Sequence, residues 1–478
     1  MKIHVVNSGE TLWKISRQYG VPINEIVTAN QLPNPNQLVV GQALVIPEVG
    51  LQHVVTPGEN LWIIARRYGT SIQAILKENA ISNPELIYPG QVLIIPTRYH
   101  VVSRGETLWS IAQRYGTTIQ AIREINQIRN ESLIYPGQRL MIPKKEKPAI
   151  EVNAYLNLIE SGEFMPVEEE QSIVSQIGEL LTYLSVFSYD IKEDGNITSL
   201  TDQKLLEAAH SHEIEPLMVI TNFKDGKFSS ELVHQLLNNA SAQDKLLTNI
   251  LNIMDQKKYA GLNIDFEYVN PSDREAYNEF LRKAVNRLHP KGYSVSTAVA
   301  PKYSSEQKGL LYEAHDYEAH GEIVDFVVVM TYEWGWAGGP PWAIAPVNEV
   351  RRVLEYAIQA IPPNKILMGM PLYGRDWKLP YVAGGPFAEQ LSPQEALSRA
   401  FKFGVSIQYH PIYEAPFYNY VDGQGIKHEV WFEDARSVQA KFNLVKTYKL
   451  RGVSYWVLGQ SFPQNWLLLK DNFQIIKK

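Results

Sequence analysis

The sequence contains no cysteine in its 478 residues. Disulfide bonds, thiolate metal sites and a cysteine nucleophile are therefore excluded. It also lacks an apolar run near the ~20 residues of a transmembrane helix, so membrane insertion is not expected. Met1 leads directly into a patterned segment without the apolar stretch of a secretory signal peptide, and we expect no such peptide.

A strong excess of one charge is also missing, because 45 Lys and Arg face 51 Asp and Glu and leave a net charge of −6. The balance is uneven: residues 1–145 carry 14 basic and 9 acidic residues, and the remainder carries 31 and 42. A basic first part would suit an anionic polymer, although chance asymmetry of a solvated surface explains it equally well. The length predicts two to four domains.

The first part of the chain repeats three times. His4-Val5-Val6 returns at 53–55 and 100–102, and the segment from Gly9 to Trp13 returns at 58–62 and 105–109 with one substitution. Each unit has a β-type run, a glycine turn, two helical segments and a closing strand, which predicts a βααβ module. We place the modules at residues 1–48, 51–97 and 98–144.

These repeated residues resemble LysM domains. The resemblance implies binding to N-acetylglucosamine-containing glycans, such as peptidoglycan or chitin, in a groove between the turn after the first strand and the turn before the second. The alternative is that the turns are only structural, and Trp13, Trp62 and Trp109 are expected in the small module cores. The turn residues implied in binding are Gly9, Glu10, Thr11, Gly58, Glu59, Gly105, Glu106 and Thr107.

A charged segment at 144–148 looks like a linker, and residues 149–478 have a different pattern. Eight β-rich runs alternate with helical segments, which predicts an α/β fold, a (β/α)8 TIM barrel. The long interval before the last run predicts a small α+β insertion at about residues 378–435, with a β-hairpin within it. The runs lie at 152–158, 181–188, 215–221, 261–268, 294–300, 323–332, 366–373 and 452–458.

The run at 261–268 alternates strictly between apolar and polar residues. Leu262, Ile264 and Phe266 share one face of the predicted strand, and the other face carries the residues Asn263, Asp265 and Glu267. In a barrel the apolar face packs on the helices and the polar face points to the axis. Buried polar groups are costly unless they are paired or functional. Glu267 would lie highest, at the rim where barrel active sites are found.

This segment resembles the Asp-Gly-x-Asp-x-Asp-x-Glu signature of glycoside hydrolase family 18, which includes chitinases and endo-β-N-acetylglucosaminidases. Two positions differ, because Ala260 replaces the first Asp and Asn263 the second. An amide at position 263 cannot share a proton with Asp265, so we expect a changed pH profile with retained activity. Segments at 330–334, 370–377, 430–434 and 454–459 also resemble this family.

The resemblance implies substrate-assisted retaining catalysis, an exception to the scheme with two catalytic carboxylates. It assigns catalysis to Glu267, Asp265 and Tyr332, with no cofactor and no metal. Each of these residues also has a simpler structural interpretation, as a buried ion-pair partner or as barrel packing. The implied substrate-binding residues are Asn263, Met330, Glu333, Trp334, Tyr373, Arg375 and Trp456.

LysM modules fused to such a catalytic domain resemble the spore cortex-lytic N-acetylglucosaminidases of endospore-forming bacteria. This resemblance implies cleavage of β-1,4 bonds after N-acetylglucosamine in cortex peptidoglycan during germination. It also implies a place at the spore coat or cortex or at the cell wall, and no nucleic-acid partner. Two alternatives stay open: a LysM chitinase that acts on chitin, and a non-catalytic wall-binding or coat protein.

Overall fold

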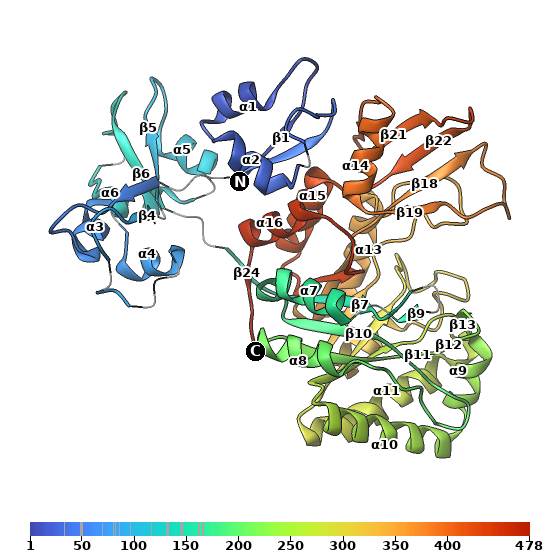
Figure 1. The fold of residues 1–478 in the computed structure, drawn as a ribbon. Helices are drawn as coiled ribbons and strands as arrows, with labels where there is room; N and C mark the ends of the chain where they lie inside the picture. Colours follow the sequence, from blue (N-terminus) through green and yellow to red (C-terminus); the bar gives the residue numbers. More distant parts are fainter. Residues whose placement is uncertain are drawn as a thin grey trace. The chain divides into compact units, whose positions relative to one another are not determined.

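The computed structural model describes the whole chain except residues 33, 48–50, 69, 80, 82, 86, 96, 116, 131–132, 144–146, 161–162 and 165–166. Most of the predicted linker at 144–148 lies outside the described residues. The described residues form two compact units, of which one joins Met1–Ile46 with Pro148–Lys478 and the other is Pro47–Lys147 (Figure 1). No helix among these residues is long and apolar enough to cross a bilayer.

Each repeat folds as a βααβ module, which confirms the prediction: two helices pack on one antiparallel strand pair. The repeated asparagine explains part of this regularity, because the Asn30 side chain donates to Ile26 O and Val45 O and accepts from Val45 N–H. The elements are β1 Lys2–Val5, α1 Leu12–Tyr19, α2 Ile23–Asn30 and β2 Ala43–Ile46; β3 Leu51–Val54, α3 Leu61–Tyr68, α4 Ile72–Glu78 and β4 Val92–Ile95; and β5 Thr97–Val101, α5 Leu108–Tyr115, α6 Ile119–Asn126 and β6 Arg139–Pro143.

The prediction that the three tryptophans lie in the module cores is wrong. Trp13, Trp62 and Trp109 are 62%, 57% and 62% exposed. In α1 the core-facing positions are taken by Leu12 and Ile15, which are both buried. Successive helix residues are rotated by about 100°, so Trp13 points away from a face defined by positions i and i+3. The same offset places the other two rings in solvent.

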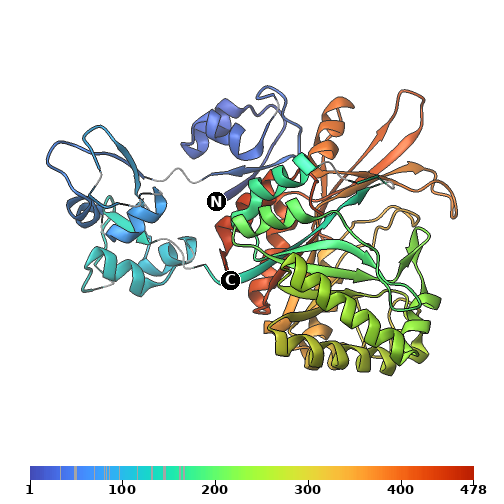
Figure 2. The ribbon, with the colours of Figure 1, turned by 60° about the horizontal axis from the view of Figure 1, so that its bottom comes forward.

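Eight parallel strands of the described residues close into a barrel, as predicted, in the order β10-β11-β14-β15-β16-β17-β23-β7 with β10 pairing back to β7. Helices cover its outside (Figure 2). The barrel strands are β7 Ala149–Asn157, β10 Tyr183–Asp190, β11 Glu215–Thr221, β14 Gly261–Asp265, β15 Ser294–Val299, β16 Phe326–Val329, β17 Ile366–Pro371 and β23 Gly452–Trp456. The helices are α7 Val167–Ile177, α8 Gln203–Ser211, α9 Ser230–Leu237, α10 Ala240–Lys257, α11 Arg274–Leu288, α12 Tyr317–Ile323, α13 Val347–Ala360, α15 Ala435–Thr447 and α16 Pro463–Asn472.

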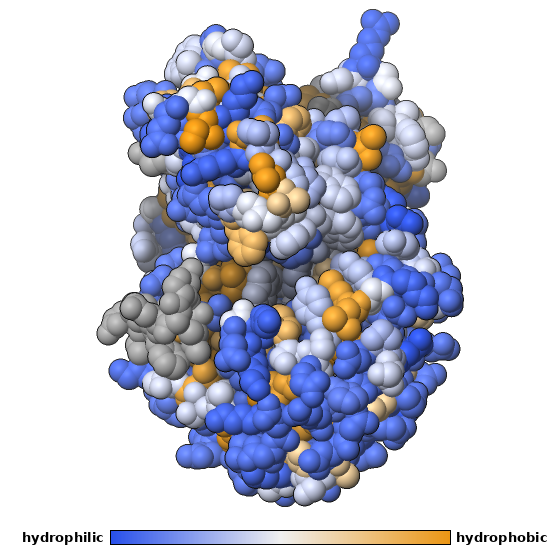
Figure 3. All heavy atoms as spheres, turned by 90° about the vertical axis from the view of Figure 1, so that its right-hand side faces the viewer, coloured by the Kyte–Doolittle hydropathy of each residue, from blue (hydrophilic) through white to orange (hydrophobic). Residues whose placement is uncertain are grey.

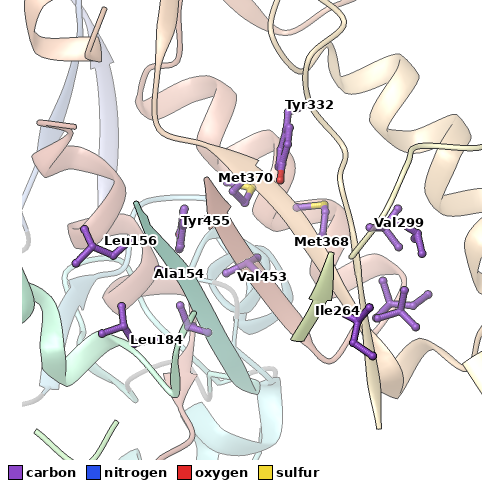
Figure 4. Close-up of a cluster of buried hydrophobic side chains, with 14 of the residues drawn as sticks. Ala154, Leu156, Leu184, Ile264, Val299, Tyr332, Met368, Met370, Val453 and Tyr455 are labelled. Carbon is purple, nitrogen blue, oxygen red and sulfur yellow. The ribbon is translucent and has the colours of Figure 1, made fainter. Parts of the chain in front are cut away.

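Two apolar layers hold the barrel together. One fills its interior and includes Tyr183, Leu217 and Phe326. The other lies between the strands and the helices, and Figure 4 shows labelled members of it from β7, β10, β14, β15, β17 and β23. Leu262, Ile264 and Phe266 belong to this outer layer, which confirms the orientation predicted for β14.

An insertion follows the seventh barrel strand, as predicted. It is a five-stranded antiparallel sheet in the order β19-β18-β22-β21-β20, with one helix. Its first strand begins at Gly374, slightly before the expected start. The elements are β18 Gly374–Leu379, β19 Glu389–Leu391, α14 Pro393–Lys402, β20 Gln408–His410, β21 Ala415–Val421 and β22 Lys427–Trp431. Short strands complete the chain: β8 Ile159–Glu160, β9 Glu163–Phe164, β12 Phe223–Lys224, β13 Lys227–Phe228 and β24 Gln474–Ile475.

A buried ion pair fixes the point where the insertion returns to the barrel. Lys441 Nζ lies 2.8 Å and 3.0 Å from the two carboxylate oxygens of Glu433, and neither side chain is more than 1% exposed. Ser437 Oγ donates to the same carboxylate at 2.6 Å. Burial raises the pKa of Glu433, and the ammonium opposes this rise. A buried charge that loses its partner is strongly destabilising.

We therefore expect Lys441→Met to lower the free energy of unfolding by about 3–5 kcal/mol, because Glu433 keeps its desolvation cost and loses its cation. Urea denaturation followed by tryptophan fluorescence measures this change. Lys402→Met on the exposed end of α14 is the matched control and should change the free energy by less than about 0.5 kcal/mol. An equal loss of unfolding free energy in the two variants would contradict the stabilising role assigned to the Lys441–Glu433 ion pair.

Candidate active site

A cavity of about 380 Å³ opens at the carboxyl ends of the barrel strands, where barrel enzymes hold their reacting groups. This end faces the viewer in Figure 3, and hydrophobic side chains are visible in a hollow near the middle of the face. The wall combines aromatic rings with three carboxyl groups. The lining residues are Tyr155, Asn157, Phe187, Phe223, Phe228, Asp265, Glu267, Ala298, Ala300, Pro301, Leu311, Tyr312, Met330, Tyr332, Glu333, Trp334 and Trp456.

Asp265 ends strand β14 and points into the cavity. Its side chain is almost fully buried, and its Oδ1 atom has no hydrogen-bond partner among the described residues. Burial raises the pKa of Asp265 to about 7, because the charged form loses its hydration. Buried acceptors are normally hydrogen-bonded, so Asp265 Oδ1 is placed to accept from a donor bound in the cavity.

Glu267 lines the same cavity and is partly exposed. Burial raises the pKa of Glu267 well above its ordinary value, and the charges of Asp265 and Glu333 raise it further. All three causes disfavour the carboxylate. The surroundings of Glu267 therefore favour its protonated form, which suits a general acid.

Two residues that the sequence analysis did not single out hold the backbone at this point. The Asn222 side chain accepts from Glu267 N–H at 3.0 Å and donates to Glu267 O at 2.8 Å. His315 accepts from Ala300 N–H through Nδ1, so its Nε2 donates to Phe266 O at 2.9 Å. Burial lowers the pKa of His315 to about 4 and keeps the ring neutral. These contacts join residues that are far apart in sequence, so a local sequence pattern does not predict them.

Asn263 lies below the cavity and does not line it. Tyr155 Oη donates to Asn263 Oδ1 at 2.9 Å, and Asn263 Nδ2 donates to Ser296 Oγ at 2.9 Å. Both ends of the amide are therefore occupied by neighbours other than Asp265. Asn263, predicted to bind substrate, is therefore not among the residues that line the cavity, and the changed pH profile expected from it stays a prediction.

The remaining predicted residues form two groups. Met330, Tyr332, Trp334 and Trp456 line the cavity. The Trp456 ring makes edge contacts with Tyr155 and Phe187, at centroid distances of 5.5 Å and 5.0 Å.

The second group is centred on Glu333, which has a positive φ of 68° and lines the cavity. Its carboxylate accepts from Tyr373 Oη and, at 2.7 Å, from the Arg375 guanidinium. One carboxylate in the loop after β16 therefore binds both the link that follows β17 and the insertion strand β18.

The predicted LysM turns already have internal hydrogen bonds. The carboxylates of Glu10, Glu59 and Glu106 each accept from a histidine of the first module strand and from a backbone N–H of the turn. Thr11 Oγ1 caps helix α1, and Thr107 Oγ1 accepts from Ser110 N–H. Gly9, Gly58 and Gly105 have φ values of 76°, 85° and 89°, which explains glycine in these turns. Their contact with sugar stays a prediction.

A closed (β/α)8 barrel with Asp265 and Glu267 at the end of its fourth strand is an architecture of glycoside hydrolases. Residues 163–461 match Glycosyl hydrolases family 18, and residues 4–47, 53–96 and 100–143 match the LysM domain. The chain belongs to glycoside hydrolase family 18, and three LysM domains precede its catalytic barrel.

Relatives cover the whole chain. The Cortical fragment-lytic enzyme of Bacillus subtilis is 48% identical over 478 residues, which is 100% of this chain and 99% of that protein. The crystal structure of the Bacillus megaterium spore cortex-lytic enzyme SleL superposes with a TM-score of 0.77 at 40% identity and covers 100% of this chain and 99% of its own. A chitinase from Chromobacterium violaceum superposes with a TM-score of 0.60 at 25% identity, over 68% of this chain and 98% of its own.

The charge of Glu333 should contribute to the position of the alkaline limb of the pH profile, after burial and the charge of Asp265. Above the pKa of Glu267 the acid form disappears, and Glu333 helps to raise that pKa. We expect Glu333→Gln to lower the pKa of Glu267 and to move the alkaline limb of kcat/KM to lower pH by roughly 0.5–1 unit. The measurement is the pH dependence of kcat/KM on a soluble N-acetylglucosamine oligosaccharide.

Glu322→Gln is the matched control, because it removes one carboxylate from the exposed face of α12. Glu322→Gln should leave the alkaline limb of kcat/KM at the wild-type pH. An alkaline limb that stays unmoved in Glu333→Gln would show that this charge does not act on Glu267.

Proposed function

We propose that this chain hydrolyses the β-1,4 bond that follows N-acetylglucosamine in spore cortex peptidoglycan. Family membership supports the reaction class, and the names of the Bacillus relatives support the cortex as the substrate. One observation carries the proposal: Glu267, whose pKa is raised by burial, shares its cavity with Asp265, whose buried Oδ1 has no donor among the residues that the structure describes. The three LysM modules support binding to the same glycan.

The first step uses the substrate's own acetamido group. Glu267 gives its proton to the glycosidic oxygen while the bond from that oxygen to the anomeric carbon breaks. The acetamido oxygen of the sugar on the non-reducing side bonds to the anomeric carbon and forms an oxazolinium ion. The remaining glycan leaves as an alcohol. This route needs an N-acetyl group next to the cleaved bond, and it accounts for N-acetylglucosamine at that position.

Asp265 and Tyr332 assist this step. The acetamido N–H is the donor that the free Oδ1 of Asp265 would accept, and the carboxylate balances the positive charge of the oxazolinium ion. Tyr332 lines the cavity and would donate its hydroxyl to the acetamido oxygen, so that this oxygen points at the anomeric carbon. Both contacts strengthen as charge develops.

The second step restores the enzyme. Glu267, now ionised, takes a proton from a water molecule that attacks the anomeric carbon, and the oxazolinium ring opens to the acetamide. Two displacements at one carbon retain its configuration. Glu267 regains its proton, and its raised pKa favours this outcome at neutral pH.

The sugar needs a surface for its apolar face and donors for its hydroxyl groups. Trp456, backed by Tyr155 and Phe187, offers the aromatic surface. Met330, Trp334 and Glu333 also line the cavity, and Glu333 is paired with Arg375. We place the protein at the spore cortex or cell wall, where this polymer is found.

Product analysis by mass spectrometry tests the proposal. Wild type and Glu267→Gln are incubated separately with cortex peptidoglycan, vegetative peptidoglycan and chitin oligomers. Wild type should release cortex fragments with N-acetylglucosamine at the reducing end, and Glu267→Gln should lose at least ~10³-fold in rate, because the proton donor is gone. Glu207→Gln on the exposed face of α8 is the control and should retain full activity.

The other outcomes discriminate between the alternatives. Cleavage of chitin alone would identify a LysM chitinase. Binding to cortex by wild type and variant without any cleavage would identify a wall-binding protein with an inactive barrel.

A further inference from the structure

The first LysM module belongs to the same compact unit as the barrel, whereas the second and third form the other unit. Strand β2 has two faces. Leu44 and Ile46 fill the core of the module, and Ala43 and Val45 join the core layer of the barrel. All four residues are at most 5% exposed. The face of β2 that points out of the module is thus covered, and it packs on helices α15 and α16.

The other two modules provide an internal comparison. In module two the same outward positions are Val92 and Ile94, which are 51% and 37% exposed. In module three they are Arg139 and Met141, of which Arg139 is exposed and Met141 is partly exposed. The three modules share a fold, and the outward face of the closing strand differs between the first module and the other two.

The turn before β2 shows the same divergence. Val39 is buried against the insertion, in a cluster with Ala396 and Ile407. The equivalent residues are Tyr88 and Tyr135, which are 64% and 61% exposed. A tyrosine would overfill the cluster that receives Val39, and overpacking of a core is destabilising.

Backbone contacts seal this interface. Ile407 N–H donates to Val40 O at 2.8 Å, and the Arg436 guanidinium donates to Gly41 O at 3.1 Å. A Cβ atom at Gly41 would lie 1.8 Å from Ile407 O, whereas Gly90 and Gly137 have open space at that point. The terminal ammonium of Met1 pairs with Asp471 at 2.7 Å. These contacts reach the insertion, α15 and α16 from one side of the module.

We infer that the first LysM module is a fixed part of the catalytic body that holds the glycan strand in one orientation relative to the barrel. Its turn residues Gly9 and Thr11 stay exposed while β2 is covered, so docking leaves this turn of the expected glycan groove open. A tethered module raises the local concentration of substrate. A docked module also fixes the direction and register of the bound glycan relative to the barrel, because the module cannot rotate on a linker.

This inference rests on the proposed function for the identity of the glycan, and its docking component can be tested without catalysis. The absence of cysteine permits two spin labels to be introduced, through Gln18→Cys on α1 and Gln359→Cys on α13. Double electron–electron resonance spectroscopy on the full chain should give a narrow distribution of the distance between the two labels. Val45→Arg should broaden it, because a charge then faces the apolar barrel surface. Ile94→Arg, at the equivalent position of module two, should leave it narrow.

The activity test compares two substrates. Val45→Arg should raise KM for long cortex glycan about 3- to 10-fold and leave kinetics on a short soluble N-acetylglucosamine oligosaccharide unchanged. Ile94→Arg should leave KM for the long glycan unchanged. Val39→Tyr is a second docking variant, chosen because modules two and three carry tyrosine at that position. It provides the test should Val45→Arg fail to fold.

Each outcome has one meaning. A broad distribution in the labelled wild type would overturn the docking. A distribution that broadens in the docking variants without any change in KM for long glycan would overturn the holding role. If the wild type cleaves neither substrate, the proposed function fails, and the distance distributions still decide whether module one is docked.

Discussion

The rest of this structure depends on one constraint: two carboxyl groups are buried at the end of a single barrel strand. Asp265 ends β14 and Glu267 follows two residues later, and burial raises the pKa of both. Such groups are tolerated where a function needs them and the surroundings hold them in place. Asn222 and His315 provide that support through the backbone on either side of Glu267. Glu333 adds a negative charge that favours the protonated acid and is itself held by Arg375.

Much of the barrel could be predicted because its signal is local. Alternation along β14 assigned Leu262 and Ile264 to the helix layer and Asp265 to the axis, and the observed layers have this arrangement. Asn222, His315 and Lys441 could not be found in this way. Each acts on a partner that only the closed fold brings near, so the sequence around it carries no signal. The tryptophan error has a different origin. Hydrophobic character alone assigned Trp13 to a core, although helix geometry had already given that face to Leu12 and Ile15.

The three LysM modules show how repeats with one fold acquire different roles. The fold that they share needs the same interior contacts, including the asparagine that accepts from the closing strand in each module. The outward face is free to differ, and in the first module it carries small and aliphatic residues that meet the insertion and two barrel helices. The insertion therefore has contacts in two directions. It packs on module one through Ile407 and supplies Arg375 to the carboxylate beside the cavity.

The protonation state of Glu267 is the central claim, and difference infrared spectroscopy tests it most directly. Spectra of wild type and Glu267→Gln are compared at neutral pH in the absence of substrate. The account predicts a band of a protonated carboxyl group in wild type that disappears in the variant, because burial and two neighbouring carboxylates keep the proton on Glu267. Loss of an ionised carboxylate band in its place would contradict the account, since Glu267 would then have no proton to give.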